Sequence, residues 1–355
     1  MKKILINGVG GPTPRSFAIA LKNYSRYDNY EFMGTDCNKY AVGLYQRDLF
    51  HKAFLIPKGT APDYWRAIEG IIRKEKIDYV VVLPEVEVLE WARRAGISSL
   101  PCKTLIPDYA IASKLVDKAV MTELLDSSGL VPKSLTILRD ELKDISKFEI
   151  PFPFWIRSAE GSSGVGSLEV NTLDELKNWI NINPGVKKFL ASTFLPGRNL
   201  CCKMLYYNGQ LLRGAVGERV YYIMSNVAPS GITGNTSFGR LLNDPDVFEV
   251  AKKAMDILFG KTGAEKHGFF TVDLKEDYRG NPKITEVNIR HIAFTQCFAA
   301  AGANFAEDTI RLLDNDPSFD TGFKLYEFEP GLIFLRDVDA LPIFMRETEL
   351  LSGER

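Results

Sequence analysis

The chain has 355 residues, of which 45% are hydrophobic and 25% are charged, an ordinary composition for a globular protein. This length exceeds what one simple core needs and indicates two or three modules. The 44 basic residues nearly balance the 45 acidic ones, and the formal net charge is −1. A nucleic-acid partner, which usually requires a basic face, is therefore not expected.

The N-terminal sequence MKKILINGVGG favours a first strand over a signal peptide, because its apolar run ends after a few residues. No window of the sequence approaches the roughly 20 apolar residues of a membrane span. The five cysteines form no C-x-x-C pair, which fits a reduced compartment, and the three histidines show no metal-ligand spacing. We expect a cytoplasmic protein with no membrane partner. The sequence leaves open whether the protein forms a homodimer.

Residues 1–112 alternate strand and helix signals. The strands are KKILIN, YEFMGTD and DYVVVLPE, and the helices are PRSFAIALKNY and PDYWRAIEGIIRKEK. Near-continuous apolar strands that alternate with helices predict a parallel sheet covered on both faces, here a Rossmann-like N-terminal domain. Such sheets bind ligands at the carboxyl ends of their strands. Those ends carry Gly8, Gly10, Gly11, Asp36, Glu85 and Glu87.

The glycines after the first strand do not complete a dinucleotide-binding fingerprint. In G-x-G-x-x-G the last glycine is replaced by Thr13. A tight strand-to-helix turn explains these glycines at least as well as a nicotinamide cofactor does.

Residues 113–190 indicate a small α+β module. SKLVDKAVMTELLDSSG reads as one helix that ends at Gly129, and TLDELKNWI as a helix capped by Thr172. Between them, Arg157 ends a strand and is followed by small residues that suit a loop closing over phosphate. A flexible hairpin tip is the simpler reading of this loop alone. The loop comprises Gly161, Ser162, Ser163, Gly164, Val165 and Gly166.

A second α+β module follows, with a metal-site domain at 191–315 and a C-terminal hairpin and tail at 316–355. Its strands begin with KFLASTFL at residue 188, and its helices are DPDVFEVAKKAMDILFG and ANFAEDTIRLLD. Antiparallel strands with segregated helices are typical of such a module.

One hairpin of this module carries hard metal ligands. If Arg279 and Gly280 form a two-residue loop, Asp273 lies directly opposite Glu286. Two opposed carboxylates repel unless a cation or a shared proton compensates. Alternation adds Asn288 and Arg290 to the same face, and turns Val272, Leu274, Val287 and Ile289 to the core and His291 away.

Two acids and an amide suit Mg²⁺, and an arginine suits a phosphoryl oxygen. A solvated hairpin face explains these residues equally well when the hairpin is considered alone. Together with the arginine and the small-residue loop, phosphate binding becomes the better explanation.

The chain resembles the ATP-grasp superfamily over residues 1–315, and within it enzymes similar to the carbamoyl-phosphate synthetase large chain. The resemblance rests on LPEVEVLE, VDKAVMTELL, WIRSAEGSSGVG, FLASTFLPG and VDLKEDYRGNPKITEVNIR in this order. It implies a parallel-sheet pre-ATP-grasp domain followed by a two-subdomain ATP-grasp fold. It also implies ATP with Mg²⁺, or alternatively Mn²⁺, as cofactors.

Matched positions give the implied roles. Asp273, Glu286 and Asn288 match the metal ligands, and Arg290 matches the arginine that meets the transferred phosphate. Lys118 and Arg157 match residues that reach the nucleotide phosphates. The connector that holds adenine matches Ser192, Thr193, Phe194 and Leu195. Two departures are Ser192 and Thr193, where members often have glutamate, and Ile289, where they often have proline.

The resemblance implies an ATP-dependent ligase that activates a small carboxylate as an acyl phosphate and joins it to an amine or ammonia. A carbamoyl-phosphate-forming or other phosphoryl-transfer enzyme and a nucleotide-sensing module are the alternatives. Substrate contacts are expected from Glu85, Glu87, Arg219 and Asn304. The simpler reading of Glu85 and Glu87 is acids at a helix N-terminus. Arg219 can be read as a surface arginine and Asn304 as a helix cap.

Overall fold

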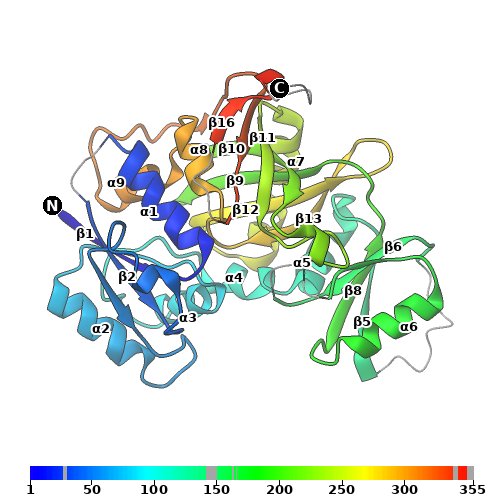
Figure 1. Cartoon of the computed structure of the whole chain (residues 1–355), viewed down its shortest axis with the longest axis horizontal. Helices are drawn as coiled ribbons and strands as arrows, with labels where there is room; N and C mark the ends of the chain where they lie inside the picture. The colour runs from blue at the N-terminus through cyan, green and yellow to red at the C-terminus, as the bar shows by residue number, and fades with distance from the viewer. Residues whose placement is uncertain (27–29, 141–149, 162–163, 165, 339–342, 350–355) are drawn as a thin grey trace.

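The computed structural model describes residues 1–26, 30–140, 150–161, 164, 166–338 and 343–349. Three β-sheets organise the molecule, with the N-terminal sheet at one end, the small sheet at the other and the large sheet between them (Figure 1). The N-terminal sheet is parallel, and the small sheet is antiparallel. The predicted combination of an α/β domain with α+β modules is confirmed.

The N-terminal sheet has the strand order β3-β2-β1-β4, and its apolar strands are buried as predicted. Leu5 and Val80 face one core with Trp91, whereas Ile4 and Ile6 face another. Strand β3 was not predicted, because its four residues KAFL show no apolar run. The elements are β1 (Lys2–Asn7), α1 (Pro12–Tyr24), β2 (Tyr30–Asp36), η1 (Val42–Leu44), β3 (Lys52–Leu55), α2 (Tyr64–Glu75), β4 (Tyr79–Val81) and α3 (Glu85–Ala95).

The single helix predicted to end at Gly129 is wrong, because the chain breaks it at Asp117. Helix α4 (Tyr109–Leu115) ends just before, and α5 (Lys118–Leu125) begins just after. The Asp117 carboxylate accepts hydrogen bonds from the backbone N–H groups of Ala119 and Val120, at 2.9 and 3.3 Å. Such an N-cap starts a new helix. As a result, Lys118 stands at the first position of α5, after which η2 (Asp126–Ser128) leads to Gly129.

The small sheet has the strand order β5-β8-β6-β7, and helix α6 packs on it. Thr172 caps α6, as predicted, by accepting from the N–H of Glu175 at 3.2 Å. The sequence grouped residues 188–195 with the later strands, but β8 pairs with β5 and β6 in this sheet. The proposed domain limits stay predictions. The elements are β5 (Ser134–Leu138), β6 (Phe154–Ser158), β7 (Leu168–Val170), α6 (Leu173–Ile182) and β8 (Lys188–Thr193).

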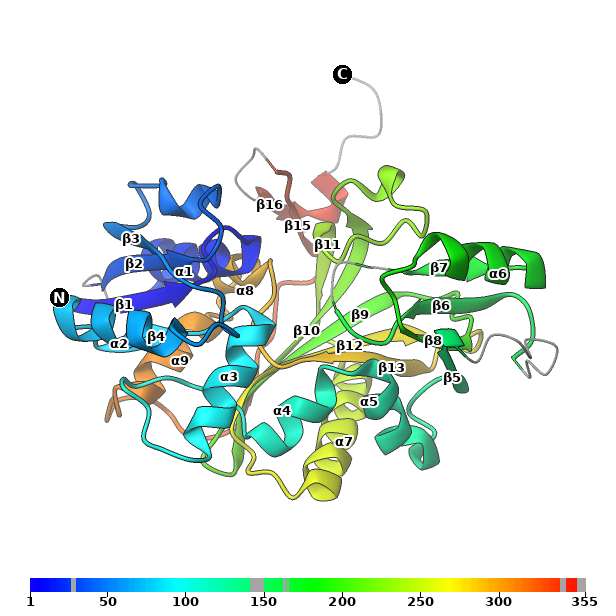
Figure 2. The same cartoon turned by 90° about the horizontal axis from the view of Figure 1, so that it is seen from below.

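The large sheet has the order β13-β12-β9-β10-β11-β15-β16, and β14 pairs with β10. Helix α7 packs on one face of this sheet with α4 and α5 (Figure 2). The elements are β9 (Asn199–Tyr207), β10 (Gln210–Tyr222), η4 (Ser225–Val227), β11 (Thr236–Leu242), α7 (Pro245–Thr262), β12 (Gly268–Glu276), β13 (Pro282–Asn288), α8 (Thr295–Ala300), α9 (Phe305–Leu313), β14 (Lys324–Leu325), β15 (Leu332–Leu335), β16 (Ile343–Arg346) and η5 (Glu347–Glu349).

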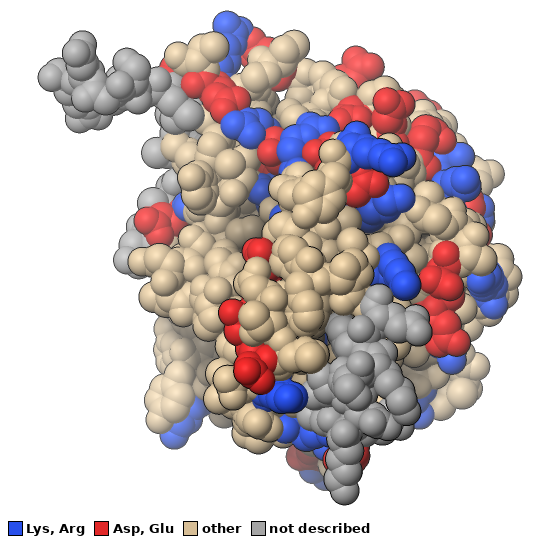
Figure 3. All heavy atoms as spheres, turned by 90° about the vertical axis from the view of Figure 1, so that its right-hand side faces the viewer, with Lys and Arg blue, Asp and Glu red and all other residues tan. Residues whose placement is uncertain are grey.

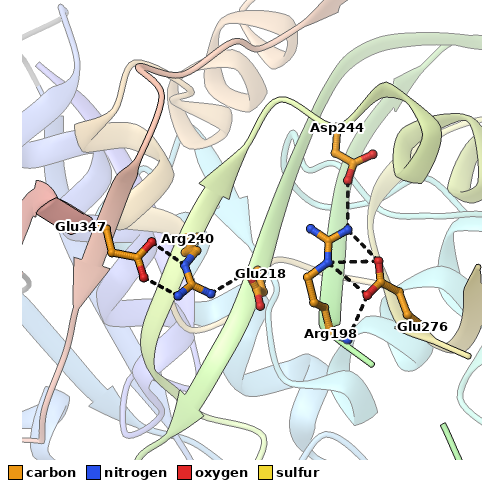
Figure 4. A network of polar contacts seen from close by, with 6 residues as sticks. All are labelled: Arg198, Glu218, Arg240, Asp244, Glu276 and Glu347. Carbon is orange, nitrogen blue, oxygen red and sulfur yellow. Dashed lines mark hydrogen bonds and ion pairs between the residues drawn. The ribbon is translucent and has the colours of Figure 1, made fainter. Parts of the chain in front are cut away.

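The C-terminal hairpin is continuous with the large sheet, since β15 pairs with β11 and β16 pairs with β15. Arg240 of β11 fastens this segment (Figure 4). Its Nε donates to Glu347 at 2.9 Å and its Nη1 to Glu218 at 3.0 Å.

A second arginine network fixes the connector between the small and large sheets (Figure 4). Nε of Arg198 lies 3.0 Å from both carboxylate oxygens of Glu276, and Nη2 lies 3.4 Å from Asp244. The backbone N–H of Gly197 also donates to the carbonyl of Glu276, at 3.0 Å. The end of the connector is therefore tied to the end of β12.

Basic and acidic side chains are interspersed on the face that Figure 3 shows. This pattern agrees with the nearly balanced charge of the whole chain. Across the described ranges, no helix combines the length and apolar character required to cross a membrane.

Candidate functional site

A cleft of about 770 Å³ lies where the three sheets meet. The N-terminal domain contributes the turns after β1 and β4, and the small sheet contributes β6 and the loop that follows it. The large sheet contributes the hairpin of β12 and β13. Residues from all three modules therefore face one space, and they include Gly8, Pro84, Arg157, Gly164, Asp273 and Glu286.

The hairpin brings the two predicted acids opposite each other. Asp273 pairs with Glu286, and one step along, Val272 pairs with Val287. Val272, Leu274, Val287 and Ile289 are buried in the core beside α7, as alternation predicted.

The two-residue loop assumed for this hairpin is nevertheless wrong. Glu276 pairs with Pro282, and the turn spans 277–281. The Asp277 carboxylate stabilises this longer turn by accepting from the N–H groups of Arg279 and Asn281, both at 2.9 Å. A β-bulge at Thr285 then inserts one residue and restores the predicted pairing at the acids.

Each acid has its own cation. Nη2 of Arg219 lies 2.5 Å from Oδ1 of Asp273, and Nζ of Lys118 lies 3.2 Å from Oε1 of Glu286. Burial raises the pKa of Asp273, against the opposing effect of Arg219. Burial also disfavours ionisation of Glu286, yet Lys118 and Arg157 lower its pKa overall. The arginine and the lysine thus permit two carboxylates to face each other.

Asn288 completes this group, because its Nδ2 donates to Oδ2 of Asp273 at 3.1 Å. Within the described ranges, no group of three or more His, Cys, Asp and Glu side chains could hold a metal ion. Asp273 and Glu286 supply hard carboxylate oxygens, and the Asn288 amide supplies a third oxygen if its two ends are exchanged. One or two carboxylates beside a phosphate site are typical of Mg²⁺.

Arg157 reaches the hairpin from the small sheet. Its Nη2 donates to the carbonyl oxygen of Thr285, the residue of the bulge. Burial lowers the pKa of Arg157, an effect that Glu286 and Asp273 oppose. The bulge therefore also provides the contact that joins the small sheet to the acid pair.

Two described residues of the small-residue loop, Gly161 and Gly164, line the cleft. Nζ of Lys118 donates to the carbonyl of Gly161 at 2.6 Å. Gly164 has φ of +72°, and a Cβ built there would collide with the carbonyl oxygen of Ile232. The expected loop residues Ser162, Ser163 and Val165 lie outside the described residues. The described part of the loop thus meets the segment between β10 and β11 in the lining of the cleft.

The expected adenine connector also lines the cleft, through Ser192, Thr193, Phe194 and Leu195. Trp155, on the neighbouring strand β6, lines the cleft with them. Phe194 and Leu195 add apolar surface, which suits a purine ring.

Arg290 lines the cleft next to the hairpin. Its Nη1 donates to the carbonyl of His291 at 3.0 Å. The His291 ring points away, as alternation predicted, and stacks on Phe269 with the ring centroids 3.6 Å apart. Arg290 and not His291 is therefore available to a ligand.

The four expected substrate residues are not equivalent. Glu85 lies within electrostatic range of Arg290 and Lys118, and burial raises its pKa. Arg219 lines the cleft and is paired with Asp273. The simpler reading of Arg219 as a surface arginine is therefore wrong.

The structure gives no support to substrate contacts from Glu87 or Asn304. Glu87 is buried and accepts hydrogen bonds from Asn7 and Tyr64, both at 2.5 Å. Asn304 caps α9 by accepting from the N–H of Glu307 at 3.2 Å. A helix cap, the simpler reading of Asn304, is what its contacts show.

Sequence reasoning missed several cleft residues. The segment 223–235 after β10 contributes Met224 and Val227, and the C-terminal segment contributes Val338. Gly231 and Gly234, both with positive φ, mark this segment as a turn-rich loop, and SGITGN is the signal that could have indicated it.

Solved structures resemble this one over 94% of the chain. The N5-carboxyaminoimidazole synthetase of Staphylococcus aureus, solved with ADP, is 16% identical, with a TM-score of 0.68 and 82% of its length covered. The L-amino acid ligase of Bacillus licheniformis is 14% identical, with a TM-score of 0.64 and 79% covered.

The biotin carboxylase domain of the Hydrogenobacter thermophilus 2-oxoglutarate carboxylase, solved with MgADP, ADP and bicarbonate, is 16% identical, with a TM-score of 0.67 and 74% covered. No protein-family model and no curated protein sequence matches the chain. The structural likeness establishes the fold, and the chain has the fold of the ATP-grasp enzymes that its sequence resembles.

Proposed function

We propose that the protein is an ATP- and Mg²⁺-dependent ligase that forms a C–N bond between a carboxylate and an amine. The observation that carries the proposal is the meeting of an opposed acid pair with four of the cations that line one cleft. The acids are Asp273 and Glu286, and the cations are Lys118, Arg157, Arg219 and Arg290. The similar structures solved with ADP or MgADP support a nucleotide in such a cleft.

In the proposed first step, an oxygen of the substrate carboxylate attacks the γ-phosphorus of ATP. The bond from that phosphorus to the bridging oxygen breaks, which gives an acyl phosphate and ADP. The amine nitrogen then attacks the acyl carbon, phosphate leaves with the C–O bonding electrons, and the nitrogen loses a proton. Positioning and charge neutralisation are the protein's main contributions to such chemistry.

Asp273 and Glu286 would hold Mg²⁺, which would supply positive charge to neutralise the phosphate groups. Lys118 and Arg157 would bind phosphate oxygens from the side of the small sheet, and Arg290 from the side of the N-terminal domain. The loop that carries Gly161 and Gly164 would exclude water and protect the acyl phosphate from hydrolysis. The connector from Ser192 to Leu195 would hold the adenine.

The test is a phosphate-release screen of the full chain with ATP, Mg²⁺, small carboxylates and amines in all pairs. Mass spectrometry then identifies the products. We expect phosphate, ADP and an amide whose mass equals that of the acid plus the amine minus water.

The outcomes separate the alternatives. A phosphorylated product without an amide would replace the ligase by a phosphoryl-transfer enzyme. Nucleotide binding without phosphate release from any pair would replace it by a sensing module.

A further inference from the structure

The part of the cleft lining that comes from the N-terminal domain is almost entirely apolar. Here the N-terminal domain contributes the turn after β1, the start of α1 and the turn after β4. The segment after β13 and the C-terminal segment complete what we term the apolar wall. The wall consists of Gly8, Gly11, Pro12, Thr13, Pro14, Leu83, Pro84, Ile292, Ala293 and Val338.

Thr13 supplies the one hydroxyl among these ten side chains. Gly8 and Pro84 approach so closely that a Cβ on Gly8 would collide with the proline ring, so the two turns are in close contact. Val338 is 64% exposed although it faces the cleft. Apolar surface that a protein leaves open inside a concave site is suited to an apolar ligand group.

The charged groups near the wall are few, and most are already engaged. Among the described residues that line the cleft, the cations are Lys118, Arg157, Arg219, Lys275 and Arg290. Of these, Lys118 and Arg219 pair with the two acids, and Arg157 donates to the carbonyl of Thr285 beside them. Lys275 follows Leu274 on β12, two residues beyond Asp273. Arg290 is therefore the cation that adjoins the wall.

Two further arginines lie close to wall residues in the chain, and both donate hydrogen bonds to carbonyl oxygens. Nε of Arg15 donates to the carbonyl of Gly11 at 3.2 Å. Nη1 of Arg336 donates to Asn235 Oδ1 at 3.0 Å and to the carbonyl of Thr236 at 2.7 Å. Neither is among the residues that line the cleft.

The acids at the carboxyl edge of the N-terminal sheet are also engaged, with one exception. Asp36 accepts from the N–H groups of Gly10 and Asn38, both at 2.8 Å. Glu87 is bonded to Asn7 and Tyr64. Glu85 alone lies within electrostatic range of Arg290, although it is not among the residues that line the cleft. The wall thus stands beside one guanidinium with one carboxylate near it, and these match the carboxylate and ammonium groups of an amino acid.

We propose that one of the two substrates is an amino acid with an aliphatic side chain and no phosphate group, and that its side chain packs on the apolar wall. This inference rests on the proposed ligase function, since it names a substrate of the same cleft. A phosphorylated substrate would require additional cations in the cleft lining beside the wall, and among the described lining residues Arg290 is the one that adjoins it.

Equilibrium binding tests the inference without depending on turnover. Isothermal titration of the full chain is performed with Mg²⁺ and a non-hydrolysable ATP analogue. The probes are two pairs of similar shape, leucine with asparagine and valine with threonine, and O-phosphoserine. We expect leucine to bind at least about tenfold more tightly than asparagine, because aliphatic burial favours leucine alone. Equal binding of the paired probes, or tighter binding of O-phosphoserine, would overturn the inference.

Two valines give a matched pair of variants. Val338→Thr replaces a methyl group of the wall by a hydroxyl, and Val42→Thr makes the same change on the exposed η1, outside the cleft. We expect leucine binding to weaken several-fold in the first variant and to stay unchanged in the second. Equal effects in both variants would contradict the packing on the wall.

The two proposals fail in different ways. Leucine binding without phosphate release from any acid and amine would support the apolar wall and overturn the ligase. Phosphate release with other carboxylates, together with no binding of aliphatic amino acids, would overturn the substrate and leave the ligase standing.

Discussion

Arg219 on β10 and Asp273 on β12 form a buried ion pair across the intervening strand β9, with 2.5 Å between Nη2 and Oδ1. The pair matters for the site, because Asp273 also stands opposite Glu286. Without the guanidinium, two carboxylates would repel each other in a desolvated cleft. The arginine that the sequence suggested for a substrate therefore already has a partner.

We expect Asp273→Asn to lower ATP-dependent phosphate release at least about 100-fold, because it removes a ligand of the proposed metal site. It should also lower the thermal stability, since breaking a buried pair leaves Arg219 uncompensated, at a cost of roughly 3–5 kcal/mol. Adding Arg219→Met should restore part of the stability but not the activity. Asp277→Asn, in the turn of the same hairpin, is the control and should remain active. Phosphate release at the wild-type rate in Asp273→Asn would refute the metal assignment.

Gly164→Ala and Gly161→Ala separate the contact between the two loops from backbone strain. Both glycines have positive φ, so each change costs about 1 kcal/mol in conformation. A Cβ on Gly164 would also meet the carbonyl of Ile232, whereas one on Gly161 meets nothing within 4 Å. We expect kcat/KM for ATP to fall roughly tenfold more in Gly164→Ala. Similar losses in both variants would show that the contact with Ile232 has no role.

Arg198→Ala should raise the KM for ATP several-fold and change kcat little. The reason is that Arg198 ties the connector, which carries the expected adenine residues, to Glu276 at the end of β12. Arg240→Ala removes a comparable network on the same sheet, away from the connector, and should leave the KM for ATP unchanged. An equal KM in the two variants would argue against a positioning role for Arg198.

The stability should depend on pH through Asp308 of α9. Burial raises the pKa of this carboxyl to about 6. Tyr326 donates a hydrogen bond to it at 2.6 Å. In the unfolded chain the pKa of an Asp carboxyl is near 3.9. The stability that protonated Asp308 provides is therefore complete below about pH 3.9 and is lost as the pH rises through about 6. At about 1.4 kcal/mol per pKa unit, the loss is on the order of 3 kcal/mol.

Asp308→Asn removes this titration. The melting temperature of the wild type relative to Asp308→Asn should therefore fall between pH 4.5 and pH 7. A constant difference between the two proteins over this range would contradict the raised pKa.

Alternation and register predicted much of the hairpin of β12 and β13. The pattern of apolar and polar residues fixed which side chains of β13 face the cleft, because neighbouring positions on a strand point to opposite faces. The pairing of Asp273 with Glu286 was also predicted, but from a wrong turn. The Asp277 carboxylate stabilises a longer turn, and the bulge at Thr285 offsets it. Neither effect follows from hydrophobic pattern.

Contacts between distant segments were the part that the sequence could not supply. The pairing of Arg219 with Asp273 and the contact of Gly164 with Ile232 depend on the tertiary arrangement of sheets. The break at Asp117 is a local event, yet the apolar run continues through it, and a single helix was the natural interpretation. The roles assigned to the site residues stay predictions until variants are measured.

The bulge at Thr285 also affects how the hairpin tolerates insertions and deletions. It lies between the turn and the acids, and it absorbs the one-residue difference between the two halves of the hairpin. Deletion of the bulged residue alone would leave Asp273 opposite Glu286, because Leu274 already pairs with Ile284. Such a deletion would, however, remove the bulged carbonyl to which Arg157 donates. The hairpin can therefore lose this residue during evolution while the acid pair stays in register, but at the cost of the contact with the small sheet.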